Sequence, residues 1–540
     1  MNSKITSALA AGGLSACASS GLAAEPRYDT NSDFGHAFRT SSAWRSAGNG
    51  PSDAHSAPNE HRLNRYTLGF LGTRWVLAAR GELPDTPTVE GNDLYVSDSG
   101  GSVWRLDART GHPVWELALP TITGLSHSRS RVSPAIGRST VVVGDQAAGT
   151  VYALSKANGH PVWHTTLATD QTAKITSSPV IVGNRVYVGV SSGQEGLAVS
   201  TPNYVPTFRG SIAALDPNDG HVLWQTYTVP PGFTGGAVWS STLAVDPARH
   251  PVYLTSGNNY PVPAAVAACQ TAAASPAALD ACLPADDWID SIVSVDSDTG
   301  AIYWGQRFQD ADTWTVSCLN LGFVPATPCP SPQGPDFDFG AGANLFSFTS
   351  YGVRHDAVAA GQKSGVHWTL DRDTGKTLWA TRAGPSGPLG GILWGTATDG
   401  RRVYVPSANS DFVDVTLVPS GRHTAGGFWS ALDATTGKIL WQTPSFGLQP
   451  PSGGNHTPPG AQARAVGSVT IAGDVLYGED TAGFLIALDA ATGRIIRSVQ
   501  SGGAAIAAPV VVNGAVYWGS GHGADGDTNN KLYAFWLGLD

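Results

Sequence analysis

The chain has 540 residues, a formal net charge of −10 at pH 7, 65 Gly, 36 Pro, 17 Trp and only 14% charged residues. This charge balance argues against a nucleic-acid partner, because binding to phosphates requires a concentrated basic patch. The composition favours many short strands joined by tight turns over a helical protein. We therefore expect an all-β fold.

Residues 1–24 are typical of a secretory signal peptide, because Lys4 precedes a weakly apolar run of small residues that is too short to span a membrane. We expect the mature protein to be periplasmic or secreted. Two processing sites remain open: cleavage before Glu25, or cleavage at a lipoprotein-type box, Leu14–Cys17, which would leave a lipid anchor on Cys17. Residues 25–60 form an N-terminal extension, and residues 61–540 form one repeat domain.

One repeat organises residues 61–540: an Asp, a Thr or Asn, and a Gly lie ahead of a Trp, as in LDARTGHPVW and LDATTGKILW. Each unit combines an alternating run, a Gly-rich hairpin, a second strand, a tight turn and a last strand, which is a four-stranded blade. In the turn, the Asp bonds its own backbone and the Gly supplies a positive φ, and we expect the Trp to lie between blades. Eight positions predict an eight-bladed β-propeller: Trp75, Trp115, Trp163, Trp224, Trp304, Trp379, Trp441 and Arg497, where the Trp is lost.

The final run, KLYAFWLGL, has no partner of its own, so we expect it to pair with the strand around RWVLAAR and close the ring. The widest spacing, from Trp224 to Trp304, places insertions in the middle blades, where they are expected to build a functional face.

Four cysteines follow the signal segment, an even number that suits two local disulfides in an oxidising compartment better than a metal site: Cys269, Cys282, Cys318 and Cys329. The chain has no Cys-x-x-Cys-His motif for haem attachment, so any electron acceptor must be external.

These repeats resemble the tryptophan-docking motif of the quinoprotein alcohol dehydrogenases, eight-bladed propellers that hold pyrroloquinoline quinone (PQQ) beside Ca²⁺ on the axis. The resemblance covers about residues 60–540. Such a site needs an aromatic platform and cations for a tricarboxylated quinone, oxygen ligands for Ca²⁺ and a carboxylate base for the alcohol proton. The repeat alone does not decide the function, because a non-catalytic outer-membrane assembly lipoprotein of the same propeller family shows a similar pattern.

The resemblance implies the metal and catalytic residues. Glu195 in SSGQEG and Asn258 in TSGNNY match Ca²⁺ ligands of the family. Asp338, the second Asp of GPDFDFGA, matches the catalytic base, which also ligates the metal, and Lys363 in GQKSG matches the cation beside the quinone oxygens and that base. The alternative for each residue is an ordinary polar side chain in a loop or turn.

The resemblance also implies six cofactor-binding side chains: Arg131, Thr176, Ser192, Trp239, Lys363 and Trp394. Arg129 lies two residues from Arg131 and on a strand would face the same side, so either arginine could pair with a quinone carboxylate. Trp239 is either the stacking platform or part of the core of a blade, and Trp394 is a second aromatic candidate.

The segments GGAVWSSTLAVDP, SGNNY, GPDFDFG and GQKSG look most like polyvinyl alcohol dehydrogenases, which oxidise secondary hydroxyls on a polymer. The resemblance implies an alcohol or hydroxylated polymer as substrate and an external acceptor such as cytochrome c. The chain lacks the adjacent-cysteine disulfide of many family members and the added haem domain of some, so it departs from those members above the quinone and in the electron route. The main rival is a non-catalytic scaffold.

A second rival is a serine hydrolase, because residues 189–193, GVSSG, match G-x-S-x-G. That motif requires a strand, a sharp turn and then a helix, and we expect a loop there instead.

Overall fold

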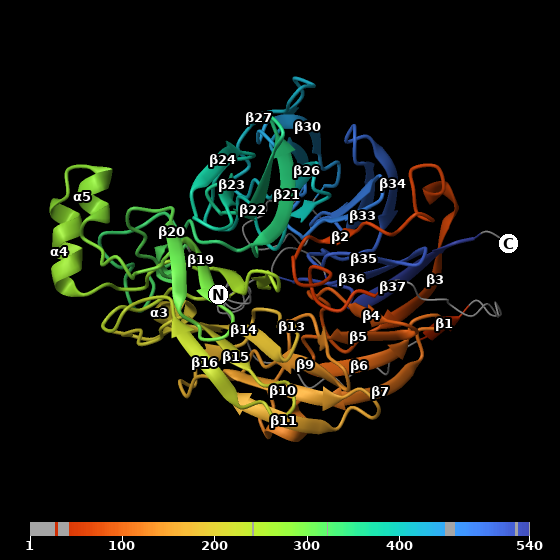
Figure 1. The fold of residues 1–540 in the computed structure, drawn as a ribbon, viewed down its shortest axis with the longest axis horizontal. Coiled ribbons are helices and arrows are strands. Elements are labelled where there is room, and N and C mark those ends of the chain that lie inside the picture. The colour runs from red at the N-terminus through yellow and green to blue at the C-terminus, as the bar shows by residue number, and fades with distance from the viewer. Residues whose placement is uncertain are drawn as a thin grey trace.

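The computed structural model describes residues 28–30, 43–239, 242–320, 322–448, 460–523 and 528–538. Eight antiparallel sheets follow one another around a central axis, and the last strand of each blade lies towards the rim (Figure 1). The predicted eight-bladed propeller is confirmed. The predicted signal peptide and Cys17 lie outside the described residues.

The first four blades contain the following strands: β4 (Thr88–Glu90), β5 (Asp93–Ser97), β6 (Ser102–Asp107) and β7 (Pro113–Ala118); β8 (Ala135–Ile136), β9 (Thr140–Gly144), β10 (Thr150–Ser155) and β11 (Pro161–Thr166); β13 (Val180–Val182), β14 (Arg185–Ser192), β15 (Ser211–Leu215) and β16 (Val222–Tyr227), with β12 (Ala173–Lys174) added to β14; and β17 (Ala244–Val245), β18 (Pro251–Thr255), β19 (Ser291–Asp296) and β20 (Ile302–Arg307).

The next three blades contain β21 (Asn344–Ser350), β22 (Val353–Gly361), β23 (Val366–Asp371) and β24 (Thr377–Arg382); β25 (Ala397–Thr398), β26 (Arg402–Ser407), β29 (Phe428–Asp433) and β30 (Ile439–Pro444); and β31 (Thr470–Ala472), β32 (Val475–Glu479), β33 (Phe484–Asp489) and β34 (Ile495–Gln500). A small hairpin, β27 (Val415–Thr416) with β28 (His423–Thr424), lies outside the blades.

The eighth blade joins the two ends of the chain. It contains β35 (Val510–Val512), β36 (Ala515–Ser520) and β37 (Lys531–Leu537), and β37 pairs antiparallel with β3 (Leu71–Ala78). β1 (Tyr28–Thr30) pairs with the outer side of β3. The predicted closure of the ring is therefore confirmed, and it leaves the ring without an unpaired seam between the first and last blades.

Seven of the predicted Trp residues fasten each blade to the next one. The indole N–H of Trp163, for example, donates to Pro217 O at 2.9 Å, in the turn of the following blade. Its ring lies against Gly220, where a Cβ would come within 2.4 Å of the ring. The same bond to the next turn recurs for Trp75, Trp115, Trp224, Trp304, Trp379 and Trp441. The Gly of the repeat is therefore needed both for its positive φ and for the space that the Trp ring fills.

The junction that lacks a Trp uses a different contact. Arg497, at the repeat position in β34, donates through Nη1 to Leu68 O and Gly69 O, both at 3.3 Å. These carbonyls belong to the 3-10 turn η1 (Leu68–Phe70), which leads into β3. A guanidinium bonded to two carbonyls thus replaces the indole at the closing junction.

Residues 44–60, which we call the belt, run across the axis and bond to seven blades. Backbone groups of the belt bond to Val89, Ile136, Val245, Leu345, Thr398 and Ile471, each in the first strand of its blade. The short strand β2 (Ser56–Ala57) pairs with β31, and the Glu60 carboxylate accepts the N–H of Gly514 at 2.8 Å. The belt therefore closes the axis at one end of the inner strands.

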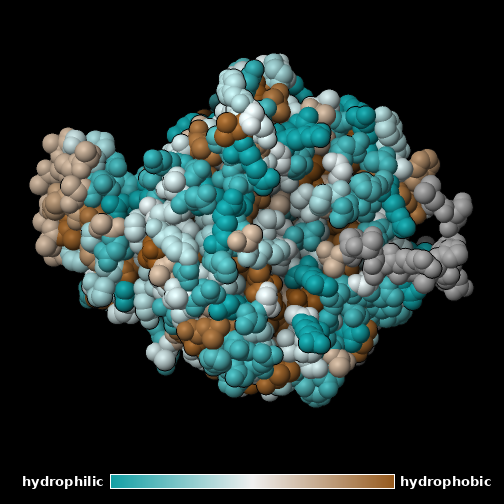
Figure 2. All heavy atoms as spheres, in the orientation of Figure 1, coloured by the Kyte–Doolittle hydropathy of each residue, from teal (hydrophilic) through white to brown (hydrophobic). Residues whose placement is uncertain are grey.

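Insertions extend the middle blades. The helices α4 (Ala264–Ala272) and α5 (Pro276–Asp280) project from the disc, and their surface is largely apolar (Figures 1 and 2). The two predicted local disulfides are confirmed: Cys269 pairs with Cys282 beside these helices, and Cys318 pairs with Cys329 in a loop that begins at η2 (Val316–Cys318). The remaining helices are α2 (Pro120–Thr123) and α3 (Gln194–Ser200). Within the part of the chain that the structure describes, no helix has the length and apolar character needed to cross a membrane.

Candidate active site

All nine residues predicted for the site lie at one end of the inner strands. Arg131, Thr176, Trp239, Asp338 and Trp394 precede the first strand of their blades. The other four follow or end a second strand: Ser192, Glu195, Asn258 and Lys363. Since the first and second strands of a blade are antiparallel, these two kinds of position meet at the same face. The belt bonds further along the same first strands, at the opposite end of the axis.

Asp338 and Lys363 form the centre of this face. Lys363 Nζ lies 2.6 Å from Asp338 Oδ1 and 2.9 Å from Asp336 Oδ1. The other Asp338 oxygen accepts the indole N–H of Trp239 at 2.7 Å. Burial alone would lower the pKa of Lys363, but the carboxylates of Asp336 and Asp338 outweigh it and raise this pKa above its usual value. Lys363 is therefore a permanent cation that, with Trp239, fixes the direction of the Asp338 carboxylate.

More carboxylates surround Lys363 than it can neutralise. Burial, followed by the charge of Asp338, raises the pKa of Glu195 to about 8. Burial likewise raises the pKa of Asp312 to about 6, although its carboxylate accepts the backbone N–H groups of Asp336 and Phe337 at 3.0 and 2.7 Å. Acidic groups held close together in this way favour a cation among them.

Glu195 and Asn258 come from neighbouring blades. Glu195 lies in the first turn of α3, directly after β14, and Asn258 follows β18. The Asn258 amide N–H₂ group donates to Asn259 O at 2.6 Å and Trp314 O at 3.0 Å, which orients the amide oxygen. Ser192 is bonded to the Tyr260 hydroxyl at 3.1 Å. The structure thus offers a carboxylate and an oriented amide oxygen, both of them suitable Ca²⁺ ligands.

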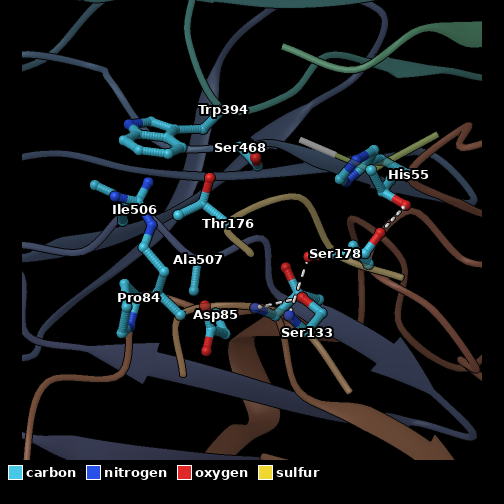
Figure 3. A pocket seen from close by; sticks show the side chains of 14 residues that line it. His55, Pro84, Asp85, Ser133, Thr176, Ser178, Trp394, Ser468, Ile506 and Ala507 are labelled. Atoms are coloured by element: carbon cyan, nitrogen blue, oxygen red, sulfur yellow. Dashed lines mark hydrogen bonds between the residues drawn. The ribbon is translucent and has the colours of Figure 1, made fainter. Parts of the chain in front are cut away.

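Three of the predicted cofactor residues line one cavity on the axis, of about 50 Å³: Arg131, Thr176 and Trp394 (Figure 3). The Arg131 guanidinium lies over the Trp394 ring, 4.8 Å from its centroid. Trp394 in turn meets the edge of Trp239, with 5.9 Å between the ring centroids, and the Thr176 hydroxyl donates to Trp239 O. His55, from the belt, lines the same cavity.

Arg129 and Arg131 have different surroundings. Residues 129–131 are not in a strand, so the expectation that both arginines face one side is wrong. Arg129 Nε donates to Gln146 Oε1 at 3.1 Å, whereas Arg131 lines the axial cavity. Arg131 is therefore the better placed of the two to meet a ligand on the axis.

The structure adds a cation that the sequence motifs missed. Lys174 ends β12, and burial together with the charges of Arg129 and Arg131 lowers its pKa to about 8. Its sequence neighbours, Ala173 and Ile175, are both apolar, and Lys174 belongs to no recognisable motif. Trp314, whose ring centroid lies 5.8 Å from Lys363 Nζ, was missed for the same reason. Arg131 and Lys174 thus bring positive charges close together, which suits an anion with several charges.

One expectation about the hydrolase motif is wrong, because GVSSG is followed by the helix α3 and not by a loop. The middle residue, Ser191, is nevertheless buried in β14, where its hydroxyl bonds to Thr176 Oγ1 at 2.7 Å and Lys174 O at 3.2 Å. Neither partner is a general base of the kind that a serine nucleophile requires. The geometry therefore still argues against a serine hydrolase.

Comparison with known proteins places this geometry in context. A family model described as outer membrane protein assembly factor BamB matches residues 72–203 and 425–535. The polyvinylalcohol dehydrogenase of Sphingopyxis sp. (strain 113P3) is 28% identical over 484 residues, which are 84% of this chain and 68% of that protein. The polyvinylalcohol dehydrogenase of Pseudomonas sp. is 26% identical, over 68% of this chain and 55% of that protein.

The crystal structure of the quinohemoprotein alcohol dehydrogenase from Comamonas testosteroni superposes with a TM-score of 0.67 and 19% identity, over 92% of this chain and 81% of that chain. The chain is thus similar to quinoprotein alcohol dehydrogenases in sequence and in fold, as its repeats and motifs predicted. These relatives are alcohol dehydrogenases, which agrees with the enzyme class predicted from the sequence. The family model leaves out residues 204–424, which carry Asn258, Asp338 and Lys363, so its match says nothing about these three residues.

Proposed function

We propose that this chain is a dehydrogenase that oxidises alcohols with PQQ and Ca²⁺ and passes the electrons to an external acceptor such as cytochrome c. The observation that carries the proposal is Asp338, a buried carboxylate held by an indole and an ammonium group on the axis of the propeller. A scaffold has no need of a carboxylate fixed in this way. The names of the relatives point to a polymer with secondary hydroxyls as substrate.

The residues present suit both groups. Glu195 and Asn258 would hold Ca²⁺ with oxygen atoms, and Asp338 would complete the set, while the positive charge would offset the excess of buried carboxylates. Arg131 and Lys174 would bind the carboxylates of PQQ, and Thr176, Ser192, Trp239 and Trp394 would contact its polar edge and rings. The axial cavity, at about 50 Å³, has room for water but not for a three-ring cofactor, so we assign it to the floor of the cofactor site.

In the reaction, Asp338 takes the proton from the substrate hydroxyl. When bound, PQQ would supply the acceptor for the hydride of the carbinol carbon, and Ca²⁺ would supply Lewis-acid polarisation of the quinone carbonyl. Lys363 holds the Asp338 carboxylate in place and presents a positive charge to the quinone oxygens. Trp239 keeps the second Asp338 oxygen in a fixed direction, so the substrate proton meets an aligned acceptor.

The same proposal covers the location of the protein. Two disulfides suit the periplasm or the extracellular medium, where thiols are oxidised. The signal segment at residues 1–24 supports the same compartment, and lipid attachment at Cys17 stays a prediction.

The decisive experiment is dye-linked oxidation of polyvinyl alcohol and propan-2-ol by the purified protein, with and without added PQQ and Ca²⁺. Turnover that needs both additions supports the proposal. Asp338→Asn should lower kcat by at least about 100-fold, because a general base contributes about 10²- to 10⁴-fold. Asp98→Asn is the matched control, since Asp98 is also buried and accepts an indole N–H, from Trp104 at 3.1 Å, but in the first blade. If PQQ does not bind the wild-type protein, the scaffold alternative replaces the enzyme.

A further inference from the structure

A second cavity lies beside the candidate active site. It has a volume of about 220 Å³ and is lined by residues of five segments: Ala198 in α3; Tyr204 and Pro206; Pro261 and Val262 after Asn258; Thr313 and Thr315; and residues 327–331. Ala198 lies three residues after Glu195 in α3, so the two side chains are neighbours on the helix surface. The cavity therefore opens next to the proposed metal ligand.

Two hydroxyls in the wall of this cavity lack partners. Thr313 and Thr315 are each only 2% exposed, and neither Oγ1 atom has a hydrogen-bond partner among the described residues. A buried hydroxyl without a partner costs about 1–3 kcal/mol, so such groups usually meet a ligand or ordered water. The third threonine, Thr327, is satisfied: it donates to Thr201 O at 2.7 Å and accepts from the N–H of Tyr204 at 2.8 Å. Thr313 and Thr315 are both among the residues that line the cavity.

One segment serves both this cavity and the candidate catalytic centre. Asp312 accepts the backbone N–H groups next to Asp338, and the Trp314 ring faces Lys363. The two residues that alternate with them, Thr313 and Thr315, line the cavity. A substrate that contacts these threonines therefore lies on the opposite side of a short segment from the groups that orient Asp338.

A disulfide loop forms the outer wall. The loop from Cys318 to Cys329 is bonded to α3 through the N–H of Ala326 to Val199 O and the N–H of Thr327 to Ala198 O, both at 2.8 Å. The segments that supply the wall also carry solvent-exposed apolar side chains: Val205 at 74%, between Tyr204 and Pro206, and Phe323 at 40% and Val324 at 91% in the disulfide loop. The lining itself includes proline rings, which offer no N–H donors.

We propose that this cavity binds a neighbouring stretch of a polyhydroxylated carbon chain while one of its hydroxyls is oxidised at Asp338. The carbon backbone of such a chain suits the prolines and exposed apolar side chains, and its hydroxyls suit Thr313 and Thr315, since a hydroxyl both donates and accepts. This inference rests on the proposed function and adds a subsite to it. A small alcohol reaches only Asp338, whereas a polymer also gains the threonine contacts.

The test uses the full chain loaded with PQQ and Ca²⁺ and compares three substrates: propan-2-ol, pentane-2,4-diol and polyvinyl alcohol. Thr313→Val and Thr315→Val should each lower the ratio of kcat/KM for polyvinyl alcohol to kcat/KM for propan-2-ol by about 2- to 12-fold, the worth of one hydrogen bond. Thr315→Ser keeps the hydroxyl and should restore the ratio. Thr470→Val removes another buried, unpaired hydroxyl, in β31, and should leave the ratio unchanged.

An unchanged ratio in both Thr313→Val and Thr315→Val would overturn the subsite. It would also be overturned if these substitutions weakened the affinity for a maltooligosaccharide more than the affinity for polyvinyl alcohol. Failure of the proposed function is recognised separately, because then no alcohol is oxidised by the wild-type protein. In that case calorimetric titration of the chain with short polyvinyl alcohol still tests the cavity: Thr315→Val should weaken binding by the same factor, and equal binding would refute the proposal.

Discussion

The affinity for PQQ should depend on Lys174 and should fall as the pH rises above 8. Burial and the charges of Arg129 and Arg131 lower the pKa of Lys174 to about 8 in the free protein. A bound tricarboxylate places negative charge beside the same cations and raises this pKa again. Because the bound state then holds a proton that the free protein has lost, binding above pH 8 must take up that proton, and raising the pH opposes it.

The magnitude follows from this linkage. One proton changes the affinity by at most about tenfold per pH unit, between the pKa of the free protein and that of the complex. If PQQ restores Lys174 to its usual value of 10.5, the full loss is about 300-fold, since 2.5 pH units separate the two values. Replacing the ammonium group in Lys174→Met should cost about 10- to 150-fold in affinity at pH 7, the worth of one charge-assisted hydrogen bond.

Isothermal titration of the chain with PQQ between pH 6.5 and 9.5, at constant ionic strength, measures both effects. Lys376→Met provides the matched control, because Lys376 is exposed in a turn of the fifth blade. Titration of PQQ itself and of other protein groups adds the same pH dependence to the affinity of the wild-type protein, Lys174→Met and Lys376→Met. The reasoning is refuted if Lys174→Met and the wild-type protein show the same pH slope.

Two further predictions concern the metal and the blade junctions. Added Ca²⁺ should raise the melting temperature of the wild-type protein but not that of Glu195→Gln, and an equal rise in both would remove Glu195 from the metal site. Gly437→Ala should cost about 2–5 kcal/mol of stability in urea unfolding, because it combines strain at φ +71° with a Cβ placed 2.5 Å from the Trp379 ring. Gly421→Ala has a similar φ of +69° but nothing within 4 Å of its Cβ, so it should lose only about 1–2 kcal/mol, and an equal loss in both variants would refute the docking argument.

The propeller was predictable because its rules are local and repeated. An Asp such as Asp433 accepts the N–H groups of Thr435 and Thr436, both at 2.9 Å, and so sets the turn within four residues of sequence. The Trp and Gly of each repeat then meet across a junction between blades. The Trp and the Gly are both recognisable in the sequence, although the contact between them is not.

The predicted site residues meet on one face because each lies at a strand end that the repeat locates. Lys174, Trp314 and the two cavity threonines were missed since their importance comes from neighbours distant in sequence, such as Tyr204 or Arg129. No spacing rule links these residues. The helix after Ser192 was also missed, because a run of seven residues is too short for helical periodicity to emerge.

The belt was described from the sequence only as an extension, because its bonds reach one blade at a time and leave no periodic pattern. This arrangement has a consequence for how the molecule folds. Residues 44–60 are synthesised before all eight blades, yet they bond to residues as distant as Gly514. Contacts of such long range form late, since the chain between them must be ordered beforehand. The segment that leaves the ribosome before the blades is therefore the last to find its place, and its docking is the step that locks a finished ring.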